Sequence, residues 1–197
     1  MSTPLLETAK EVIKSQIQAL QTLLETVNEE VESAAQLIQK SKGRVIVTGV
    51  GKSGHIGRKI AATLASTGTP AFFLHAAEGN HGDLGMITSD DIVIAISKSG
   101  RTEEVMMLIP YIHKIGAKII AFTADPISPL SKYANVTLDI GVRSEVAFLQ
   151  MVPTNTTTAS LVLGDALAIA LSVARDFTFE EYAIFHPGGS IGVTLTI

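Results

Sequence analysis

The sequence predicts an α/β protein in which a parallel sheet of five strands lies between two layers of helices. Two observations carry this prediction. Five short apolar runs alternate with stretches of helical periodicity, and the first and third runs lead into polar, glycine-containing turns that open helices. Strands that alternate with helices form parallel sheets covered on both faces, and right-handed crossovers bring the strand ends to one edge. We therefore expect a three-layer α/β/α fold that binds its ligand at that edge.

Length and composition favour one domain over residues 1–197. The chain is 46% hydrophobic and 17% charged, which suits a globular protein with a sizeable core. Its net charge of −4, without a cluster of lysines and arginines, argues against a nucleic-acid partner. The absence of cysteine excludes disulfides, and a cytoplasmic location is the default. The N-terminus does not resemble a signal peptide and no apolar run reaches ~18 residues, so we expect no membrane partner.

The N-terminal segment, residues 5–41, is predicted to form one long helix. Its apolar residues recur at alternating steps of four and three, which is the heptad pattern of a helix packed along a partner. These residues are Ile13, Ile17, Leu20, Leu24, Val27, Val31, Ala34 and Ile38. The apolar seam could pack on the chain's own sheet or form an interface between copies, and the two can coexist.

From residue 44 onward, the elements follow one another as strand and helix. The predicted strands cover residues 44–47, 71–74, 91–96, 118–122 and 135–140. Helices are expected near residues 53–67, 102–115 and 128–133. A loop over residues 141–158 should lead to an apolar helix at about 155–175 and a second helix near 178–185. We see no repeat and no linker.

The first glycine-rich turn, Gly49-Val50-Gly51-Lys52-Ser53-Gly54, matches G-x-G-x-x-G after a strand. Glycine lets the backbone approach an anion, and the N-terminus of a helix attracts it. A dinucleotide site also needs an acid at the end of the second strand, but that strand ends at His75. A nucleoside triphosphate loop would need a glycine near Ile46. The turn therefore predicts a phosphate site, and a dinucleotide-dependent oxidoreductase is only a minor alternative.

The turn after the third strand, Ser97-Lys98-Ser99-Gly100-Arg101-Thr102, places three hydroxyls and a glycine at a helix start. Hydroxyls and backbone N–H groups in such a loop can surround one phosphate monoester. Alternatively, Ser99 or Thr102 is only a helix N-cap, with a following glutamate as its capping-box partner. Two such loops on one sheet favour phosphate binding.

Candidate acid–base groups follow the fifth strand and the last helix. Glu145 precedes four apolar residues, which could raise its pKa and make it a base, although a solvated loop glutamate is the alternative. His186 and His81 lie in glycine-containing turns, whereas His55 and His113 fall on predicted helices and are assigned structural roles. No histidine spacing resembles a local metal motif.

Over about residues 40–195 the chain resembles the sugar isomerase (SIS) domain superfamily and, within it, the bacterial arabinose 5-phosphate isomerases. The resemblance rests on five motifs in order: "GVGKSGHIGRKIAATLASTGTPAFFLH", "HGDLGMI", "DIVIAISKSGRTEE", "PTNTTTASLVLGDALAIAL" and "HPGGSIG". It implies a flavodoxin-like five-stranded sheet and reversible isomerisation of D-arabinose 5-phosphate and D-ribulose 5-phosphate. It also implies dimers or tetramers with sites built from more than one subunit, which favours a homotetramer.

The resemblance assigns catalytic importance to Lys52, Glu104, Glu145 and His186. It adds Gly68, Thr69 and His81 to the substrate site, and it links His75 to an inhibitory zinc while requiring no cofactor. Together with the two phosphate loops, the expected substrate-binding residues are Gly51, Ser53, Gly68, Thr69, His81, Ser97, Lys98, Ser99 and Thr102.

Two departures leave the identity of the sugar open. Relatives usually read Ser-Asn-Ser-Gly-Glu where this chain has residues 97–101, and Cys-Pro-Leu-Gly-Leu-Ala-Pro-Thr where it has residues 147–154. Both changes lie beside the expected sugar. Long members of the family continue into a paired CBS module after "HPGG", whereas this chain ends first. We therefore expect either a naturally short form without that module or a piece cut from a longer protein.

The implied reaction passes through a cis-enediol and needs one base and one group that stabilises the oxygen charge. Glu145 is the first choice for the base, His186 would open the ring or carry hydroxyl protons, and Lys52 would polarise the carbonyl or hold the phosphate. Glu104 would orient Lys52 through an ion pair, or act as the base instead. The rival functions are a non-catalytic sugar-phosphate sensor and an isomerase of another ketose phosphate, such as a hexulose 6-phosphate.

Overall fold

A computed structural model describes residues 4–146 and 150–187 and confirms the predicted sheet. Five strands pair in parallel in the order β2-β1-β3-β4-β5. Their bounds are Val45–Gly49 (β1), Ala71–His75 (β2), Ile92–Ile96 (β3), Lys118–Thr123 (β4) and Val136–Asp139 (β5). Because all strands point the same way, their carboxyl ends share one edge of the sheet.

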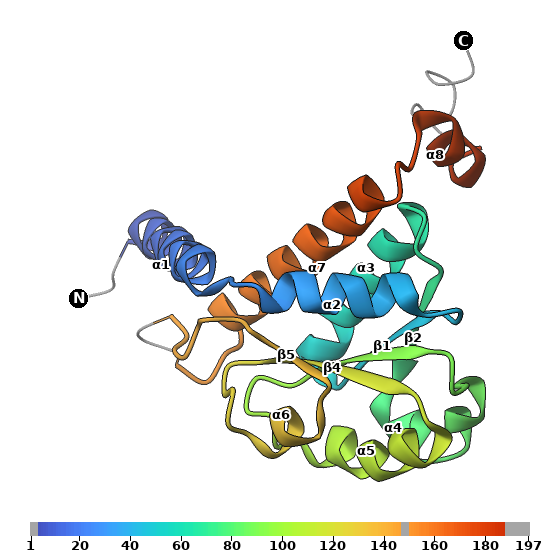
Figure 1. Cartoon of the computed structure of the whole chain (residues 1–197). Coiled ribbons are helices and arrows are strands. Elements are labelled where there is room, and N and C mark those ends of the chain that lie inside the picture. The colour runs from blue at the N-terminus through green and yellow to red at the C-terminus, as the bar shows by residue number, and fades with distance from the viewer. Residues whose placement is uncertain (1–3, 147–149, 188–197) are drawn as a thin grey trace.

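Helices cover both faces of this sheet, as Figure 1 shows, so the three-layer prediction is confirmed. On one side lie α2 (Glu30–Lys40), α3 (Gly51–Ser66) and α7 (Asn155–Ala174), with α1 (Leu5–Thr26) beside α7. The other side carries the short helix α4 (Ala76–Gly79), α5 (Glu103–Ile115) and α6 (Pro129–Tyr133). A 3₁₀ turn, η1 (Asp83–Met86), follows α4, and α8 (Phe179–Phe185) follows α7.

The alternation of side chains along each strand divides the core into two layers. In β3, Ile92, Ile94 and Ile96 join the cluster under α2, α3 and α7, whereas Val93 and Ala95 join the cluster under α5. Successive residues of a strand point to opposite faces, and a sheet covered on both faces needs apolar residues on both. This explains why the strands are continuous apolar runs in the sequence.

The long N-terminal helix is confirmed, but its predicted extent of residues 5–41 is wrong. The helix ends at Thr26, and Val27 has an extended backbone (φ −58°, ψ 127°). The Asn28 side chain then accepts a hydrogen bond from the backbone N–H of Glu30 at 2.9 Å, which starts α2. The heptad spacing continues through this break, so periodicity alone could not reveal it.

The apolar seam consequently divides between two roles. Ala34 and Ile38 of α2 are buried in the core, whereas Ile13 and Ile17 of α1 have 57% and 52% of their surface exposed. The side of α1 that packs on the chain instead includes Ala19, which joins the core cluster. The second half of the seam therefore packs on the chain's own sheet, and the first half remains available to another surface.

Helix α7 is the most apolar of the helices in the described part of the chain. By length and composition alone it could cross a membrane, with a mean hydropathy of 1.7 over its most apolar window. In the fold it packs against α1, α2 and α3, and Gly164 lets it approach Ile60 of α3. A packed core helix has the same composition, so this is weak evidence for a membrane span.

Candidate functional site

The two predicted phosphate loops lie side by side at the carboxyl edge of the sheet. The first runs from the end of β1 through Val50 into the first turn of α3, which contains Gly51, Lys52 and Ser53. The second, residues 97–102, connects β3 to α5. Because β1 and β3 are neighbouring strands, both loops open at the centre of the same edge. This is the position at which open α/β sheets bind ligands.

The first loop presents backbone donors. Gly51 has a positive φ of +57°, which glycine adopts without strain, and nothing lies within 4 Å of the place where its Cβ would be. The side chain of the N-cap residue, Val50, makes no capping hydrogen bond to α3. The first N–H groups of this helix therefore point toward the edge, where an anion could accept their hydrogen bonds. Lys52 is exposed in the same turn, and Ser53 is half-buried.

The second loop is fixed to β4. The buried Ser97 donates its backbone N–H to the carbonyl of Phe122 at 3.0 Å, and its hydroxyl lies 2.8 Å from that of Thr102. The carbonyl of Lys98 accepts hydrogen bonds from the N–H of Ala124 at 2.9 Å and the hydroxyl of Thr123 at 3.1 Å. These bonds hold the backbone of the loop before any ligand arrives.

The alternative in which this loop only caps α5 is wrong. Thr102 occupies the N-cap position, but its side chain makes no capping hydrogen bond and contacts Ser97 instead. The Ser99 hydroxyl accepts the N–H of Arg101 at 3.2 Å, inside the loop. The start of α5 is therefore without a side-chain cap, as the start of α3 is.

Gly100 should be essential to the shape of the second loop. Its φ is +60°, and a Cβ would overlap the side chain of Ser128, the N-cap of α6. We expect Gly100→Ala to destabilise the protein by about 1–2 kcal/mol for the backbone conformation and by about 1–3 kcal/mol more for the overlap. Gly51→Ala is the matched control, because its φ is nearly the same but its surroundings are open. Equal urea-denaturation midpoints for the two variants would contradict the steric argument.

Glu145 lies beyond β5, deep in the protein, with only 1% of its side chain exposed. Its Oε1 accepts hydrogen bonds from the ammonium of Lys98 at 3.0 Å and from the hydroxyl of Thr156. Its Oε2 accepts the backbone N–H of Thr154 at 2.9 Å and of Thr156 at 3.2 Å. Since Thr154 is the N-cap of α7, the carboxylate of Glu145 caps this helix from outside it.

The prediction of a raised pKa for Glu145 is wrong. Burial would raise the pKa, but the hydrogen bonds from Thr156, Thr154 and Lys98 outweigh it, so the pKa of Glu145 lies below its ordinary value. The alternative of a solvated loop glutamate is also wrong, because the side chain is buried. Residues 147–149, among the apolar neighbours on which that reasoning relied, lie outside the described residues.

Lys52 and Glu104 belong to the same edge. The pairing of Lys59 with Asp165 shows that α3 and α7 run side by side, which brings Lys52 to the level of the start of α7. Glu104 is the second residue of α5, and its carbonyl accepts a hydrogen bond from Asn80 at 3.2 Å. Within the described residues, Lys52 and Glu104 form no ion pair, so the expected orienting contact is not found.

Two of the predicted substrate residues, Gly68 and Thr69, are not brought to this edge. They connect α3 to the start of β2 and so lie at the amino edge. A Cβ on Gly68 would lie 2.6 Å from the ring of Phe177. The Gly68 carbonyl accepts a hydrogen bond from the Arg175 guanidinium at 2.8 Å. Within a single chain, Gly68 therefore packs where the C-terminal end of α3 meets the residues that follow α7.

His186 also lies away from the carboxyl edge. It follows α8, beyond the C-terminal end of α7 in Figure 1, whereas Glu145 binds the N-terminal end. The 20 residues of α7 separate them by roughly 30 Å. The His186 ring stacks on Tyr182 with centroids 3.9 Å apart, and its Nδ1 lies 2.9 Å from the Tyr182 carbonyl. The glycines that follow Pro187 in the His-Pro-Gly-Gly motif lie outside the described residues.

The remaining two histidines of interest are His75, the last residue of β2, and His81, which follows this strand. His75 ends this strand, and its Nδ1 accepts the backbone N–H of Ala77 at 3.3 Å, while His81 is exposed in the turn after α4. Residues 4–146 and 150–187 contain no group of three or more His, Cys, Asp or Glu side chains that could hold a metal. Within the described residues, His75 therefore has no set of neighbouring ligands in its own chain.

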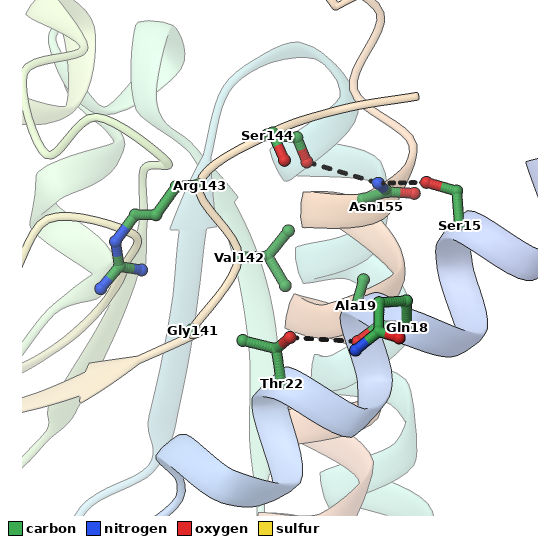
Figure 2. A pocket seen from close by; sticks show the side chains of 9 residues that line it. All are labelled: Ser15, Gln18, Ala19, Thr22, Gly141, Val142, Arg143, Ser144 and Asn155. Carbon is green, nitrogen blue, oxygen red and sulfur yellow. Dashed lines mark hydrogen bonds between the residues drawn. The ribbon is translucent and has the colours of Figure 1, made fainter. Parts of the chain in front are cut away.

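A cavity of about 410 Å³ opens beside the site, between α1 and the connection from β5 to α7. Figure 2 shows Asn155 in this cavity, where its Nδ2 donates to the Ser15 hydroxyl at 2.9 Å, while the Arg143 side chain points away from Asn155. Arg143 pairs with Asp139 instead. Sequence reasoning missed the contribution of α1. It also missed Thr154 and Thr156 as partners of Glu145, although the threonine run of residues 154–158 was a visible signal.

The sequence and the fold of this chain are similar to those of known proteins. Residues 37–170 match the SIS domain family. The chain is 50% identical over 192 residues to arabinose 5-phosphate isomerase KdsD of Pseudomonas aeruginosa, covering 98% of this chain and 59% of that protein. With KdsD of Escherichia coli K12 it shares 47% identity over 191 residues, covering 97% and 58%. The chain thus spans about three-fifths of the length of these relatives.

A solved structure is similar over nearly its whole length. The structure of the Escherichia coli CFT073 protein c3406 in complex with arabinose 5-phosphate superposes with a TM-score of 0.90 and 40% sequence identity, covering 93% of this chain and 97% of that one. The family match includes all five strands and both phosphate loops. The chain therefore belongs to the SIS domain family.

Proposed function

We propose that this protein is an isomerase that interconverts D-arabinose 5-phosphate and D-ribulose 5-phosphate through a cis-enediol. The observation that carries the proposal is that two phosphate loops lie at one sheet edge and lead into helices, α3 and α5, that have no side-chain cap. Lys52, Lys98 and Glu104 lie at the same edge. The choice of sugar is supported by the names of the relatives and by the arabinose 5-phosphate bound in the similar structure.

In the proposed reaction, the N–H groups and hydroxyls of the loop at residues 97–102 bind the phosphate. A carboxylate removes the proton from C1 of the ketose and returns it to C2, while a proton moves between the two oxygens. The protein gains and loses no electrons in this exchange. We assign Glu104 as this carboxylate. Lys52 is assigned as the cation that stabilises the negative charge on the enediolate oxygen. No step passes through a metal, and an inhibitory zinc at His75 remains a prediction.

We further propose that the protein works as a homo-oligomer, either a dimer or a tetramer. Gly68, Thr69 and His186 lie away from the carboxyl edge of their own chain, so they can join a substrate site only at the edge of another copy. The exposed apolar side chains of α1 offer such copies a surface to bury. We expect the protein to act in the cytoplasm, with neither nucleic acid nor membrane as a partner.

Charged residues on α1 should dissociate the oligomer. The double substitution Ile13→Glu/Ile17→Glu places two charges in the exposed half of the seam, and desolvating them in an interface would be costly. We expect light scattering after size-exclusion chromatography to show the mass of one folded chain. Gln18→Glu, which adds a charge at an exposed position of α1 away from the Ile13 and Ile17 stripe, is the control and should leave the assembly intact. A wild-type protein that is already monomeric would contradict the proposal.

The function is tested by incubating the purified protein with ribulose 5-phosphate and, in parallel, with fructose 6-phosphate. We expect arabinose 5-phosphate to form in the first reaction, as identified by chromatography against standards. Conversion of the hexulose alone would keep the reaction type and change the substrate. If neither sugar reacted but both bound, the sensor function would replace the isomerase.

A further inference from the structure

The carboxylate of Glu145 has no acceptor site left for a substrate proton. A carboxylate offers about four lone-pair sites, and five donors surround them. Lys98 and the Thr156 hydroxyl donate to Oε1, while two backbone N–H groups and, at 3.5 Å, the Thr154 hydroxyl donate to Oε2. The side chain is also almost completely buried, and all five donors belong to the protein itself. To act as a base it would have to break one of these bonds.

The lowered pKa of Glu145 also argues against its acting as the base. Buried carboxylates that serve as bases are usually tuned toward neutral pH, because a weakly basic group removes protons slowly. Here the hydrogen bonds stabilise the ionised form and move the pKa in the opposite direction. The environment therefore favours the ionised form of Glu145.

Lys98 is the partner that faces outward. Its ammonium uses one of three protons on Glu145, and 39% of its side chain remains exposed. Its backbone lies in the loop at residues 97–102, where Ala124 and Thr123 fix its carbonyl. A rigid backbone and a buried counter-ion together hold the ammonium beside the phosphate loop.

We propose that Glu145 is a positioning residue, which fixes the start of α7 and directs Lys98 to bind the anionic substrate. Lys98 then determines substrate affinity at this site, and the proton is transferred by a different carboxylate. This inference rests on the proposed function for the identity of the substrate. The pairing predicts that Glu145 influences substrate affinity through Lys98.

The test compares wild type, Lys98→Met, Glu145→Gln and the double variant. D-Arabinitol 5-phosphate, which cannot isomerise, serves as the binding probe in calorimetry, and kcat and KM are measured with ribulose 5-phosphate. A hydrogen bond to a charged group suggests that Lys98→Met weakens binding and raises KM by about 10- to 100-fold. Glu145→Gln should have the same effect or a smaller one, and the double variant should be no worse than Lys98→Met. Lys98→Arg, which keeps the charge, should restore part of the affinity.

Other outcomes overturn the assignment. A loss of about 10²–10⁴ in kcat for Glu145→Gln, with unchanged probe affinity, would identify Glu145 as the base. Wild-type affinity in Lys98→Met would remove Lys98 from the site. If Glu145→Gln does not fold, as judged by far-UV circular dichroism, Lys98→Met and Lys98→Arg still decide the role of Lys98. If wild type binds the probe without turning over sugar, the isomerase proposal fails while the binding comparison still tests the pair.

Discussion

Replacing Glu104 with glutamine is expected to slow isomerisation by about 10²–10⁴-fold, which is the usual contribution of a positioned general base. Glutamine keeps the size and the polarity of the side chain but cannot accept the proton. Because Glu104 starts α5 next to the phosphate loop, the loss should fall on kcat, with KM changed little. Steady-state kinetics with ribulose 5-phosphate would measure both.

Glu103→Gln provides a matched control for this variant. Glu103 is the neighbouring residue in the first turn of the same helix, and it is exposed. Both substitutions remove one negative charge from the N-terminus of α5, so they share any effect on helix stability. If Glu104→Gln retained the activity of Glu103→Gln, the base would have to be another group, and Glu145 would return as the first candidate.

Removal of the Lys52 charge should have the second large effect. Lys52→Met is expected to lower kcat by about 10²–10³-fold, similar to the removal of one donor from an oxyanion hole. Methionine preserves the apolar stem and the helix propensity of the first turn of α3. The expected result is a protein that keeps its stability but no longer stabilises the enediolate.

Lys59→Met is the corresponding control, since Lys59 lies two turns further along α3 and, among the residues that the structure describes, forms its ion pair with Asp165 on the surface. Exposed ion pairs contribute little to stability, so this variant should retain normal turnover. If Lys52→Met and Lys59→Met lost the same activity, Lys52 would act through the net charge of α3 and not through a contact with the substrate. A raised KM with normal kcat would assign Lys52 to phosphate binding alone.

Most of the fold could be predicted from the sequence because each strand is buried on both faces. Such strands must be apolar runs, and the five predicted runs match β1 to β5 to within two residues at each end. The short elements α4 and η1 between β2 and β3 were not predicted, since four residues are too few to show a period. The break at residues 27–29 was missed because the apolar spacing passes through it unchanged.

The site was less predictable, because its chemistry depends on contacts between distant segments. The phosphate loops are local features, and their glycines and hydroxyls can be recognised in the sequence. The environment of Glu145 is set by threonines about ten residues later and by Lys98 from the loop between β3 and α5. The apolar neighbours in the sequence suggested a raised pKa, and these polar contacts reverse it.

The positions of Gly68, Thr69 and His186 have a direct bearing on assembly. Resemblance places all three at the substrate, yet one chain holds them at the far end of α3 and α7 from Glu145. If they contribute to the site, a second copy must supply them. Loss of activity on dissociation by Ile13→Glu/Ile17→Glu would then accompany the change in mass.

The most direct test of the enediol isomerase is proton NMR of ribulose 5-phosphate incubated with the protein in D₂O. The account predicts that deuterium enters C1 of ribulose 5-phosphate while arabinose 5-phosphate appears with deuterium at C2, since the abstracted proton exchanges on the base. Arabinose 5-phosphate that forms without deuterium in either sugar would contradict the enediol route. The absence of both exchange and product, with folded protein, would contradict the isomerase itself.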